Sequence, residues 1–324
     1  MSSTWPLLKI KDYPIQIIDG DGGSNYPNKS ELLKSGYCLF LNTGNVTKTG
    51  FDFSSCAFID KEKHSVLRKG TLSRFDTILT TRGTIGNVAF YSSSVVLDNI
   101  RINSGMLILR PDPKYLLPEF FYQLMRSEVF QKQAELFMYG AAQPQLPITT
   151  LKHISLPLPQ LDTQKKISVI LSAYDNLIEN NLERIKLLEE MAKITYEEWF
   201  VRMKFPGHEV VKIDSQTGLP TGWKPQTLRG VTSYINRGVA PKYVEEDGFP
   251  VINQKCIRGH RVNFAESRLT ASEHKVPTDK LLQPLDILVN STGTGTLGRV
   301  AQLFDCSDRA TVDTHVTTLR AMEC

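Results

Sequence analysis

The sequence has few cysteines, and no two of them are spaced for a metal site. Its 324 residues contain five cysteines and no Cys-x-x-Cys pair. Structural zinc sites and disulfide-stapled domains depend on paired or densely spaced cysteines, and the six histidines show no ligand spacing either. We therefore expect no metal site, and buried free thiols at Cys38, Cys56, Cys256, Cys306 and Cys324.

Long hydrophobic runs are also missing. No stretch approaches the length of a membrane span, and the opening residues MSSTWPLLKIKDYP lack the basic-then-apolar layout of a signal peptide. With 41% hydrophobic and 22% charged residues, the composition is that of an ordinary globular chain, long enough for two domains or more. We expect a cytoplasmic protein that does not contact a membrane.

Motifs of catalysis or nucleotide binding are absent or incomplete. There is no N-P-P-Y or D-P-P-Y of amino methylation, and the PDPK segment at 111–114 has no downstream Glu-x-Lys to complete a nuclease signature. The segment GTGTLG at 293–298 fits G-x-G-x-x-G, but Arg299 and Val300 stand where a P-loop needs Lys and Ser or Thr. A dinucleotide site would need a following helix, whereas the turn-forming DCSDR follows soon after. A tight turn between strands is the better interpretation, and we expect no catalytic residue.

An internal repeat is the strongest signal in the chain. GYCLFLNTGNVTKTGFDF (36–53) matches GFPVINQKCIRGHRVNF (248–264), and FDTILTTRGTIGNVAFY (75–91) matches LDILVNSTGTGTLGRVAQLF (285–304). A third block aligns VVLDNIRINSGMLILRP with ATVDTHVTTLRAM, at an offset that stays near 210. Three blocks in the same order predict a duplicated domain. The alignment pairs Asp76 with Asp286, Gly83 with Gly293, Gly86 with Gly298, Asp98 with Asp313 and Arg110 with Arg320. For Asp98 and Asp313 a structural turn role is expected, because neither has a recognisable catalytic partner.

Within each copy, short blocks rich in Val, Ile, Phe and Thr, separated by Gly and Asn, predict strands joined by turns. In the first copy the segment 119–137 predicts one helix of about five turns after a proline start. A proline-punctuated connector follows at 140–167, in which Gln143 and Gln145 are candidates for pinning it to the lobe. The second copy stops at Cys324, level with about residue 114 of the first. We expect either a truncated second domain or a partner helix supplied by another chain.

The stretch from Leu161 to Phe200 predicts one long helix, because no other stretch keeps a single period for so long. Its apolar residues form a seam spaced for coiled-coil packing, which requires a partner helix. At about 1.5 Å per residue the helix would span roughly 55 Å and would suit a spacer between two bodies. Asn181 lies on the seam, where a buried amide costs stability but fixes register and partner. A long core helix of a single domain is the alternative. The seam comprises Ile167, Tyr174, Asn181, Leu188 and Thr195, alternating with Leu171, Ile178, Ile185, Ala192 and Trp199.

Charge is distributed unevenly along the chain. Residues 1–160 hold 17 basic and 13 acidic residues, residues 161–200 hold 5 and 8, and residues 201–324 hold 16 and 13. Two basic lobes joined by an acidic helix fit lobes that meet a polyanion and a helix that serves protein contacts, although differences of this size also arise by chance.

These features together resemble the specificity subunit of type I restriction-modification enzymes. The resemblance lies in the order of a Gly-Thr-Ile-Gly turn (83–86), a Pro-Glu-Phe helix start (118–120), a Gly-Ala-x-Gln loop (140–143), the connector ISLPLPQLDTQKKI (154–167), a long helix ending near EEWF (197–200) and the segment LPTGWKPQTL (219–228). It covers essentially the whole chain, and its most specific part is the connector with the helix.

The resemblance implies an α/β (α+β) fold with two duplicated target-recognition domains, each reading half of a bipartite double-stranded DNA site. The expected domains are 1–155, a connector and spacer helix at 156–205, and an incomplete second domain at 206–324. Methyltransferase subunits and a restriction or motor subunit are the implied partners. This chain would be noncatalytic and bind no cofactor, while S-adenosylmethionine, ATP and Mg would act in the other subunits. The family has a second long helix that this chain lacks, which favours self-association through the seam.

Bases are read by Arg, Lys, Asn and Gln, and phosphates are met by Lys, Arg, Ser and Thr. Candidates in or beside turns are Lys48, Arg82, Asn87, Asn99, Arg101 and Asn103 in the first copy, and Arg237, Lys242, Arg258, His260, Arg261 and Arg299 in the second. A solvated surface role is the alternative for each. Two other functions stay open: a coiled-coil scaffold whose lobes do not bind DNA, and a nucleotide-dependent enzyme built on GTGTLG.

Overall fold

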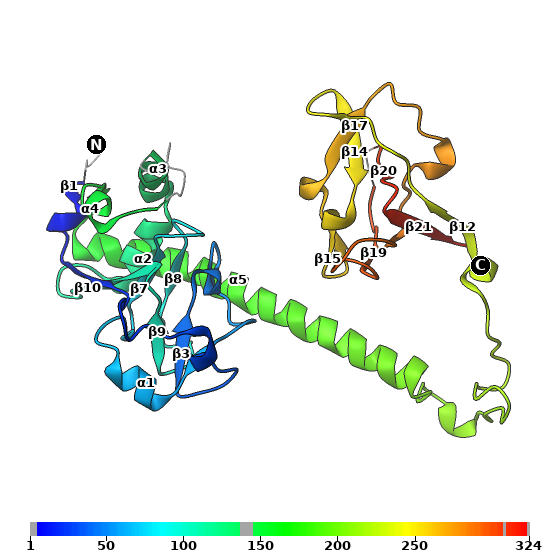
Figure 1. Ribbon diagram of the computed structural model, residues 1–324, viewed down its shortest axis with the longest axis horizontal. Helices are drawn as coiled ribbons and strands as arrows, with labels where there is room; N and C mark the ends of the chain where they lie inside the picture. Colours follow the sequence, from blue (N-terminus) through cyan, green and yellow to red (C-terminus); the bar gives the residue numbers. More distant parts are fainter. Residues whose placement is uncertain (1–4, 137–144, 307–308, 323–324) are drawn as a thin grey trace. The chain divides into compact units, whose positions relative to one another are not determined.

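The computed structural model describes residues 5–136, 145–306 and 309–322. The chain divides into two compact units, Met1–Lys193 (unit 1) and Ile194–Cys324 (unit 2). Each unit mixes strands with short helices, and a single long helix, α5, runs through the middle of the sequence (Figure 1). The mixed α/β (α+β) fold expected from the sequence is confirmed.

The centre of unit 1 is a four-stranded antiparallel sheet in the order β2-β10-β7-β8. Alternate residues of its strands face opposite sides, as period-two side-chain alternation requires. Leu107 and Leu109 pack into one core on the helix side, whereas Met106 and Ile108 pack into a second core beneath the other face. The strands are β2 (Ile15–Asp19), β7 (Thr77–Thr80), β8 (Val88–Phe90) and β10 (Met106–Pro111).

The second core of unit 1 is closed by a smaller sheet in the order β6-β3-β9. Its central strand, β3 (Cys38–Leu41), is buried along its whole length and pairs in parallel with β9 (Ile100–Ile102) and antiparallel with β6 (Phe58–Ile59). The short hairpin β4 (Val46–Thr47) and β5 (Gly50–Phe51) follows β3. Smaller elements complete the unit: β1 (Leu7–Lys9) pairs with β11 (Ser155–Pro157), and the short helices α1 (Lys61–Val66) and α4 (Ile148–Leu151) belong to the same unit.

Two helices, not one, cover the helix side of the central sheet. The prediction of a single helix over 119–137 is wrong, because α2 (Pro118–Arg126) ends before its C-cap residue Ser127 and α3 (Glu128–Leu136) begins after it. Ser127 has an extended backbone, and its hydroxyl donates to the carbonyl of Leu124 at 2.6 Å. Serine competes in this way for the backbone bonds of a helix, so it ends helices well. The break lets Phe121 and Phe130 enter the same core.

The predicted long helix is confirmed. Helix α5 (Leu161–Tyr196) is 36 residues long and passes into a π-helical turn at Glu197–Val201. Only its first turns are buried, at Gln164 and Ser168. Beyond them the side chains of Leu171, Ile178 and Leu188 are 39%, 53% and 62% exposed, so α5 carries an uncovered apolar stripe in this chain.

Unit 2 repeats the strand order of unit 1. Its larger sheet, β12-β21-β18-β19, corresponds strand for strand to β2-β10-β7-β8, and its smaller sheet, β13-β17-β14-β20, again has one parallel pair, between β14 and β20. The strands are β12 (Thr232–Arg237), β13 (Tyr243–Val244), β14 (Gly248–Ile252), β17 (Arg268–Ala271), β18 (Ile287–Asn290), β19 (Val300–Gln302), β20 (Thr311–Val312) and β21 (Val316–Ala321). A hairpin of β15 (Ile257–Arg258) and β16 (Arg261–Val262) follows β14, as β4 and β5 follow β3, and the short α6 (Leu228–Val231) precedes β12.

The duplication extends to single side chains. Nε and Nη2 of Arg110 donate to the carboxylate of Asp76 at 2.7 and 2.8 Å. The same atoms of Arg320 donate to the carboxylate of Asp286 at 2.8 and 2.8 Å. Both aspartates are fully buried. The residue before each, Phe75 and Leu285, has φ of 71°, an uncommon value for a bulky side chain. Such a strained detail at matching positions confirms the repeat.

One pairing in the sequence alignment is wrong. Asp313 corresponds to Asn103 and not to Asp98. The backbone N–H of Asn103 donates to Leu41 of β3, and that of Asp313 donates to Ile252 of β14, which is the matching strand. Asp98 instead forms an exposed ion pair with Arg74 at 2.7 Å. The sequence alignment is out of register by five residues here, because it pairs two aspartates. The fold instead keeps a side-chain oxygen that accepts a hydrogen bond at this position, from Asn103 in one unit and from Asp313 in the other.

The two units differ in what covers the larger sheet. In unit 1, α2 and α3 lie over the face that carries Leu107 and Leu109. In the part of unit 2 that the structure describes, no helix covers the matching face, where Ile235 and Val300 are 37% and 38% exposed.

Among the described residues, no helix is both long and apolar enough to cross a membrane.

Candidate nucleic-acid interface

Three turns of unit 1 meet at one end of its sheets. We call them turn cluster 1: residues 42–45 after β3, residues 81–87 between β7 and β8, and residues 103–105 between β9 and β10. The hydroxyl of Thr84 donates to the carbonyl of Thr43 at 3.0 Å, and the backbone N–H of Thr81 donates to Gly105 at 2.8 Å. These bonds tie the loops into one rigid surface, the usual way in which a fold positions binding residues.

Two of the predicted DNA-contacting residues lie next to each other in turn cluster 1. The backbone N–H of Arg82 donates to the carbonyl of Gly105 at 3.2 Å, and the side-chain oxygen of Asn103 accepts from the N–H of Gly105 at 2.9 Å. Arg82 is exposed, so its guanidinium is accessible to a ligand. Arg82 also forms an isolated bridge with Gln145, so the connector is attached to turn cluster 1 at that residue. Gln143 lies outside the described residues.

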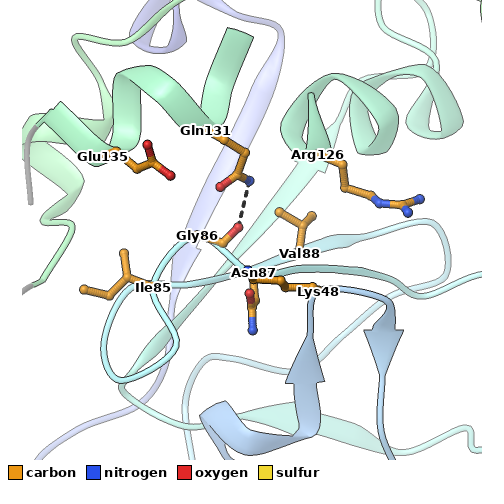
Figure 2. A pocket seen from close by; sticks show the side chains of 8 residues that line it. All are labelled: Lys48, Ile85, Gly86, Asn87, Val88, Arg126, Gln131 and Glu135. Atoms are coloured by element: carbon orange, nitrogen blue, oxygen red, sulfur yellow. Dashed lines mark hydrogen bonds between the residues drawn. The ribbon is translucent and has the colours of Figure 1, made fainter. Parts of the chain in front are cut away.

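Lys48 and Asn87 line a pocket of about 520 Å³ beside the same cluster (Figure 2). Lys48 is at the tip of the β4–β5 hairpin and is exposed. The side-chain amide of Asn87 donates to the carbonyl of Val46 at 2.9 Å, which fixes the hairpin against the turn. On the other side of the pocket, Gln131 of α3 donates to the carbonyl of Gly86 at 2.9 Å, as Figure 2 shows.

Arg101 does not belong to an interface, and the prediction for it is corrected. Its side chain is only 3% exposed and donates to the carbonyls of His64, Leu67 and Lys69. An arginine used in this way stabilises the loop after α1 and cannot reach a base. Asn99 is partly buried at the opposite end of β9 from Asn103, where its carbonyl accepts from the N–H of Leu39 at 2.8 Å.

Unit 2 builds the same arrangement with different side chains. Turn cluster 2 consists of residues 253–256, 291–299 and 313–315. The side-chain amide of Gln254 donates to the hydroxyl of Thr292 at 3.0 Å, and that hydroxyl lies 2.7 Å from Nδ1 of His315. The side-chain oxygen of Asp313 accepts from the N–H of His315 at 2.9 Å, as Asn103 does from Gly105.

The expectation for GTGTLG is confirmed. Residues 293–298 form the turn of the antiparallel β18–β19 hairpin, and the backbone N–H of Gly298 donates to Asn290 at 2.9 Å. Gly86 donates to Thr80 in the matching bond of unit 1, at 3.0 Å. Among the described residues after the turn there is no helix, whereas a dinucleotide site holds the phosphate at the start of a helix.

A basic hairpin stands beside turn cluster 2. The β15–β16 turn carries Arg258, Gly259, His260 and Arg261, all exposed. Gly259 and His260 have φ of 57° and 58°, the left-handed pair of a tight two-residue hairpin. The hairpin packs against β19, at whose start Arg299 is half-buried and donates to the carbonyl of Gly295 at 3.1 Å. Four predicted residues therefore lie on neighbouring elements: Arg258, His260, Arg261 and Arg299.

Arg237 ends β12 next to turn cluster 2. Its neighbour Gly238 approaches the turn so closely that a Cβ there would lie 1.8 Å from the carbonyl oxygen of Val312. Arg237 itself is exposed. Lys242 is exposed as well, but its backbone is bonded to Thr270 and Ala271 of β17, and no described contact joins it to the cluster.

The sequence did not single out Gln254, Thr292 or His315. These side chains hydrogen-bond one another at the centre of turn cluster 2. The repeat contained the signal, because at an offset near 210 they fall at the positions of Thr43, Arg82 and Gly105. Asp313 lies beneath them, and burial raises the pKa of its carboxyl above the ordinary value, with the His315 N–H and imidazole opposing that shift.

The described residues contain no group of three or more His, Cys, Asp or Glu side chains that could hold a metal ion. Of the cysteines described, Cys38 and Cys256 are buried and Cys56 and Cys306 are half-buried, and burial raises the pKa of Cys38 to about 11. A thiol with a raised pKa is a poor nucleophile, so Cys38 has the properties of a core residue.

The predicted helix-pairing residues divide into two groups. Ile167 packs against the helix-side core of unit 1, so its assignment to a pairing seam is wrong. The other large apolar seam residues, Leu171, Tyr174, Ile178, Ile185, Leu188 and Trp199, are between 39% and 63% exposed. Asn181 lies among them and is also exposed.

Two units of one topology each carry a rigid cluster of polar turns, and a helix with an uncovered apolar stripe connects them in the sequence. These are features of a recognition protein. Residues 15–190 match the family model described as "Type I restriction modification DNA specificity domain". The chain belongs to this family.

The relatives of the chain are named as specificity subunits of type I restriction enzymes. It is 27% identical over 296 residues to the type I restriction enzyme MjaIX specificity subunit of Methanocaldococcus jannaschii, covering 89% of this chain and 62% of the relative. It is 26% identical over 189 residues to the HindI specificity subunit of Haemophilus influenzae, covering 56% of this chain and 39% of the relative. The chain thus spans less than two thirds of the length of these relatives.

A solved structure has the same fold. The S subunit of a type I restriction-modification system from M. genitalium aligns with a TM-score of 0.53 at 16% identity, covering 100% of this chain and 74% of that one. At this identity the similarity concerns the fold alone.

Proposed function

We propose that this chain is a noncatalytic DNA-recognition subunit of a type I restriction-modification complex. Each unit reads one half of a bipartite DNA target through its turn cluster, and α5 separates the two readings. Membership of the specificity family supports the class of function. The assignment of particular side chains rests on their position in this fold.

The observation that carries the proposal is the repetition of the turn cluster. A duplicated scaffold keeps its backbone bonds while its side chains differ: the exposed Arg82 and the partly buried Asn103 of unit 1 correspond to the partly buried Thr292 and the buried Asp313 of unit 2. A constant frame with changed donors and acceptors is what two readers of two different half-sites require, because sequence is read by the pattern of donors and acceptors on base edges.

The basic residues beside each cluster have a different role. Arg258 and Arg261 flank the tip of the β15–β16 hairpin, and Lys48 occupies the tip of the matching β4–β5 hairpin. Phosphate contacts position a protein on the duplex, whereas base contacts specify the sequence. We assign the hairpin tips to the phosphates and the turn clusters to the base edges.

Helix α5 serves protein contacts in this proposal. An apolar stripe that stays exposed over several turns marks an interaction surface. Methyltransferase subunits, a restriction or motor subunit and a second copy of this chain are the partners we propose. S-adenosylmethionine, ATP and Mg would then be bound by those other subunits.

Duplex binding by the full chain tests the proposal. We expect the affinity for double-stranded DNA, measured by fluorescence anisotropy, to fall steeply with salt, because phosphate contacts release counterions. Sequence preference should appear once the methyltransferase partner is added. Salt-independent binding, or no binding with the partner present, would contradict it and would favour the alternative: a coiled-coil scaffold whose units do not bind DNA.

A further inference from the structure

The first turn of α5 is fastened to unit 1 by one buried side chain. Gln164 is 1% exposed, and its oxygen accepts from the backbone N–H of Leu117 at 2.9 Å. Its amide donates to the carbonyls of Pro159 and Tyr115 at 2.8 and 3.2 Å. Leu117 is the N-cap residue of α2, so this attachment joins the start of α2 to the start of α5. Ile167, one turn further along, packs against the helix-side core of unit 1. A helix held only near its start can still pivot there.

A second attachment lies at the other end of α2. Nη1 of Arg126 donates to both carboxylate oxygens of Asp175 at 3.0 and 3.0 Å, and Gln123 donates to the same carboxylate. The guanidinium also lies 5.0 Å from the ring of Tyr122, which stacks on Phe90 of β8 at 5.2 Å. The charged pair is therefore fixed to the central sheet as well as to the helix.

Two attachments on one helix define a direction. Gln164 and Asp175 are about 16 Å apart along α5 at 1.5 Å per residue. We propose that Gln123, Arg126 and Asp175 are positioning residues that fix the angle at which α5 leaves unit 1, and thereby the spacing of the DNA half-sites. The part about spacing rests on the proposed function, whereas the angle is a property of unit 1 alone.

The length of the free helix makes this angle important. The stretch from Asp175 to Lys193 is about 27 Å long, so a tilt of about 10° moves its end by about 5 Å. One base-pair step in DNA is about 3.4 Å. If the angle at Asp175 varied by this amount, the spacing between the half-sites would vary by more than one base pair. The length of the helix does not limit this variation, because it leaves the angle undetermined.

A distance measurement on the full chain tests the angle. Spin labels at the exposed positions 34, in unit 1, and 186, on α5, are introduced with a genetically encoded amino acid, so the native cysteines stay in place. Double electron–electron resonance should give a narrow distance distribution for the parent chain. Asp175→Ala and Arg126→Gln should each broaden it about twofold, since a tilt of about 10° displaces the label by several ångström. Far-UV circular dichroism should stay unchanged.

Two further variants separate the attachment from general loosening. Glu183→Ala removes an exposed carboxylate two turns further along α5 and should leave the distribution narrow. The double variant Asp175→Ala/Arg126→Gln should be no broader than either single variant, because both remove the same contact. A narrow distribution in both single variants, or equal broadening by Glu183→Ala, would overturn the proposal.

The spacing is tested in cells that carry the complete system. Methylome sequencing should show one spacer length with the parent chain and additional lengths, differing by one base pair, with Asp175→Ala. A single unchanged spacer in spite of a broadened distance distribution would overturn the spacing claim. If the parent chain directs no split-site methylation, the proposed function fails, and the angle is then judged by the distances alone.

Discussion

The buried ion pairs Asp76–Arg110 and Asp286–Arg320 occupy matching places and can be compared directly. Both aspartates are fully buried, and each is held by two bonds from one guanidinium. Removing the cation leaves a buried carboxylate without its partner, which is costly.

We expect Arg110→Met and Arg320→Met to lower the free energy of unfolding by about 2–3 kcal/mol each, the cost of an unpaired charged group. Urea unfolding of the full chain measures this. Lys132→Met, which breaks an exposed pair with Glu128 on α3, is the matched control and should change nothing measurable. An equally small effect at all three positions would show that the buried pairs do not hold the sheets.

Asp313 gives a prediction with a definite pH dependence. Burial raises its pKa in the folded state, so the folded chain binds the proton more tightly than the unfolded chain. Its contribution to the free energy of unfolding is therefore favourable below the unfolded pKa of 3.8. This contribution is lost as the pH rises through the pKa of the folded state. Asp313→Asn keeps an oxygen for the N–H of His315 and matches Asn103 of unit 1. At neutral pH we expect the variant to be at least as stable as the parent, with the difference shrinking in acid. Thermal unfolding across pH measures it, and an advantage that grows toward acid would contradict the assignment.

Arg258 tests the role of the basic hairpin. If its guanidinium meets a phosphate, Arg258→Gln should weaken duplex binding similarly on all sequences and reduce the slope of log K against log salt by about one. Arg229→Gln on α6 removes an equivalent exposed charge and is the control. A loss confined to one DNA sequence would instead assign Arg258 to a base.

Single residues mark the limit of what the sequence could predict. Arg82 and Arg101 are both arginines close to glycine-containing turns, yet one is exposed and the other is 3% exposed among backbone carbonyls. The carbonyls that enclose Arg101 come from residues 64–69, more than thirty positions away. The local sequence pattern contains no information about such distant partners. It therefore could not show that Arg82 is exposed and Arg101 is buried.

At the scale of elements, α5 was the most predictable part of the fold. Its seam has one period for five heptads, and such a pattern has few alternative structures. The α2–α3 pair was less predictable, because a serine in the middle of an amphipathic stretch is tolerated in many helices. The break is favoured by the packing of Phe121 and Phe130 into one core, a tertiary contact that a local pattern does not show.

The stripe on α5 predicts association. We expect the full chain to self-associate or to bind a partner helix, and Ile185→Glu to weaken this by placing a charge on the stripe. Lys186→Glu, one position along, alters charge on the polar side and is the control. Sedimentation velocity over a range of concentrations gives the answer. A parent chain that stays monomeric alone and with its partners, or equal effects of both variants, would contradict the role of the stripe.

At the scale of the whole molecule, the proposal that each unit reads one half-site depends on the duplication. Both units have the same strand order and the same three-turn cluster. In both, a residue with positive φ precedes a buried aspartate. The repeat was predictable because its blocks keep their order and offset. Strand pairing was not, since the parallel partners β3 and β9 are separated by sixty residues and leave no local signal.

Methylome sequencing of cells carrying the complete system tests the central claim most directly, because it reads both halves of the target at once. The account predicts modified adenines in one split motif, and a double substitution in turn cluster 2, Thr292→Ala with Gln254→Ala, should change one half of that motif and leave the other half intact. A continuous motif, or a change in both halves together, would contradict the claim that each unit reads its own half-site.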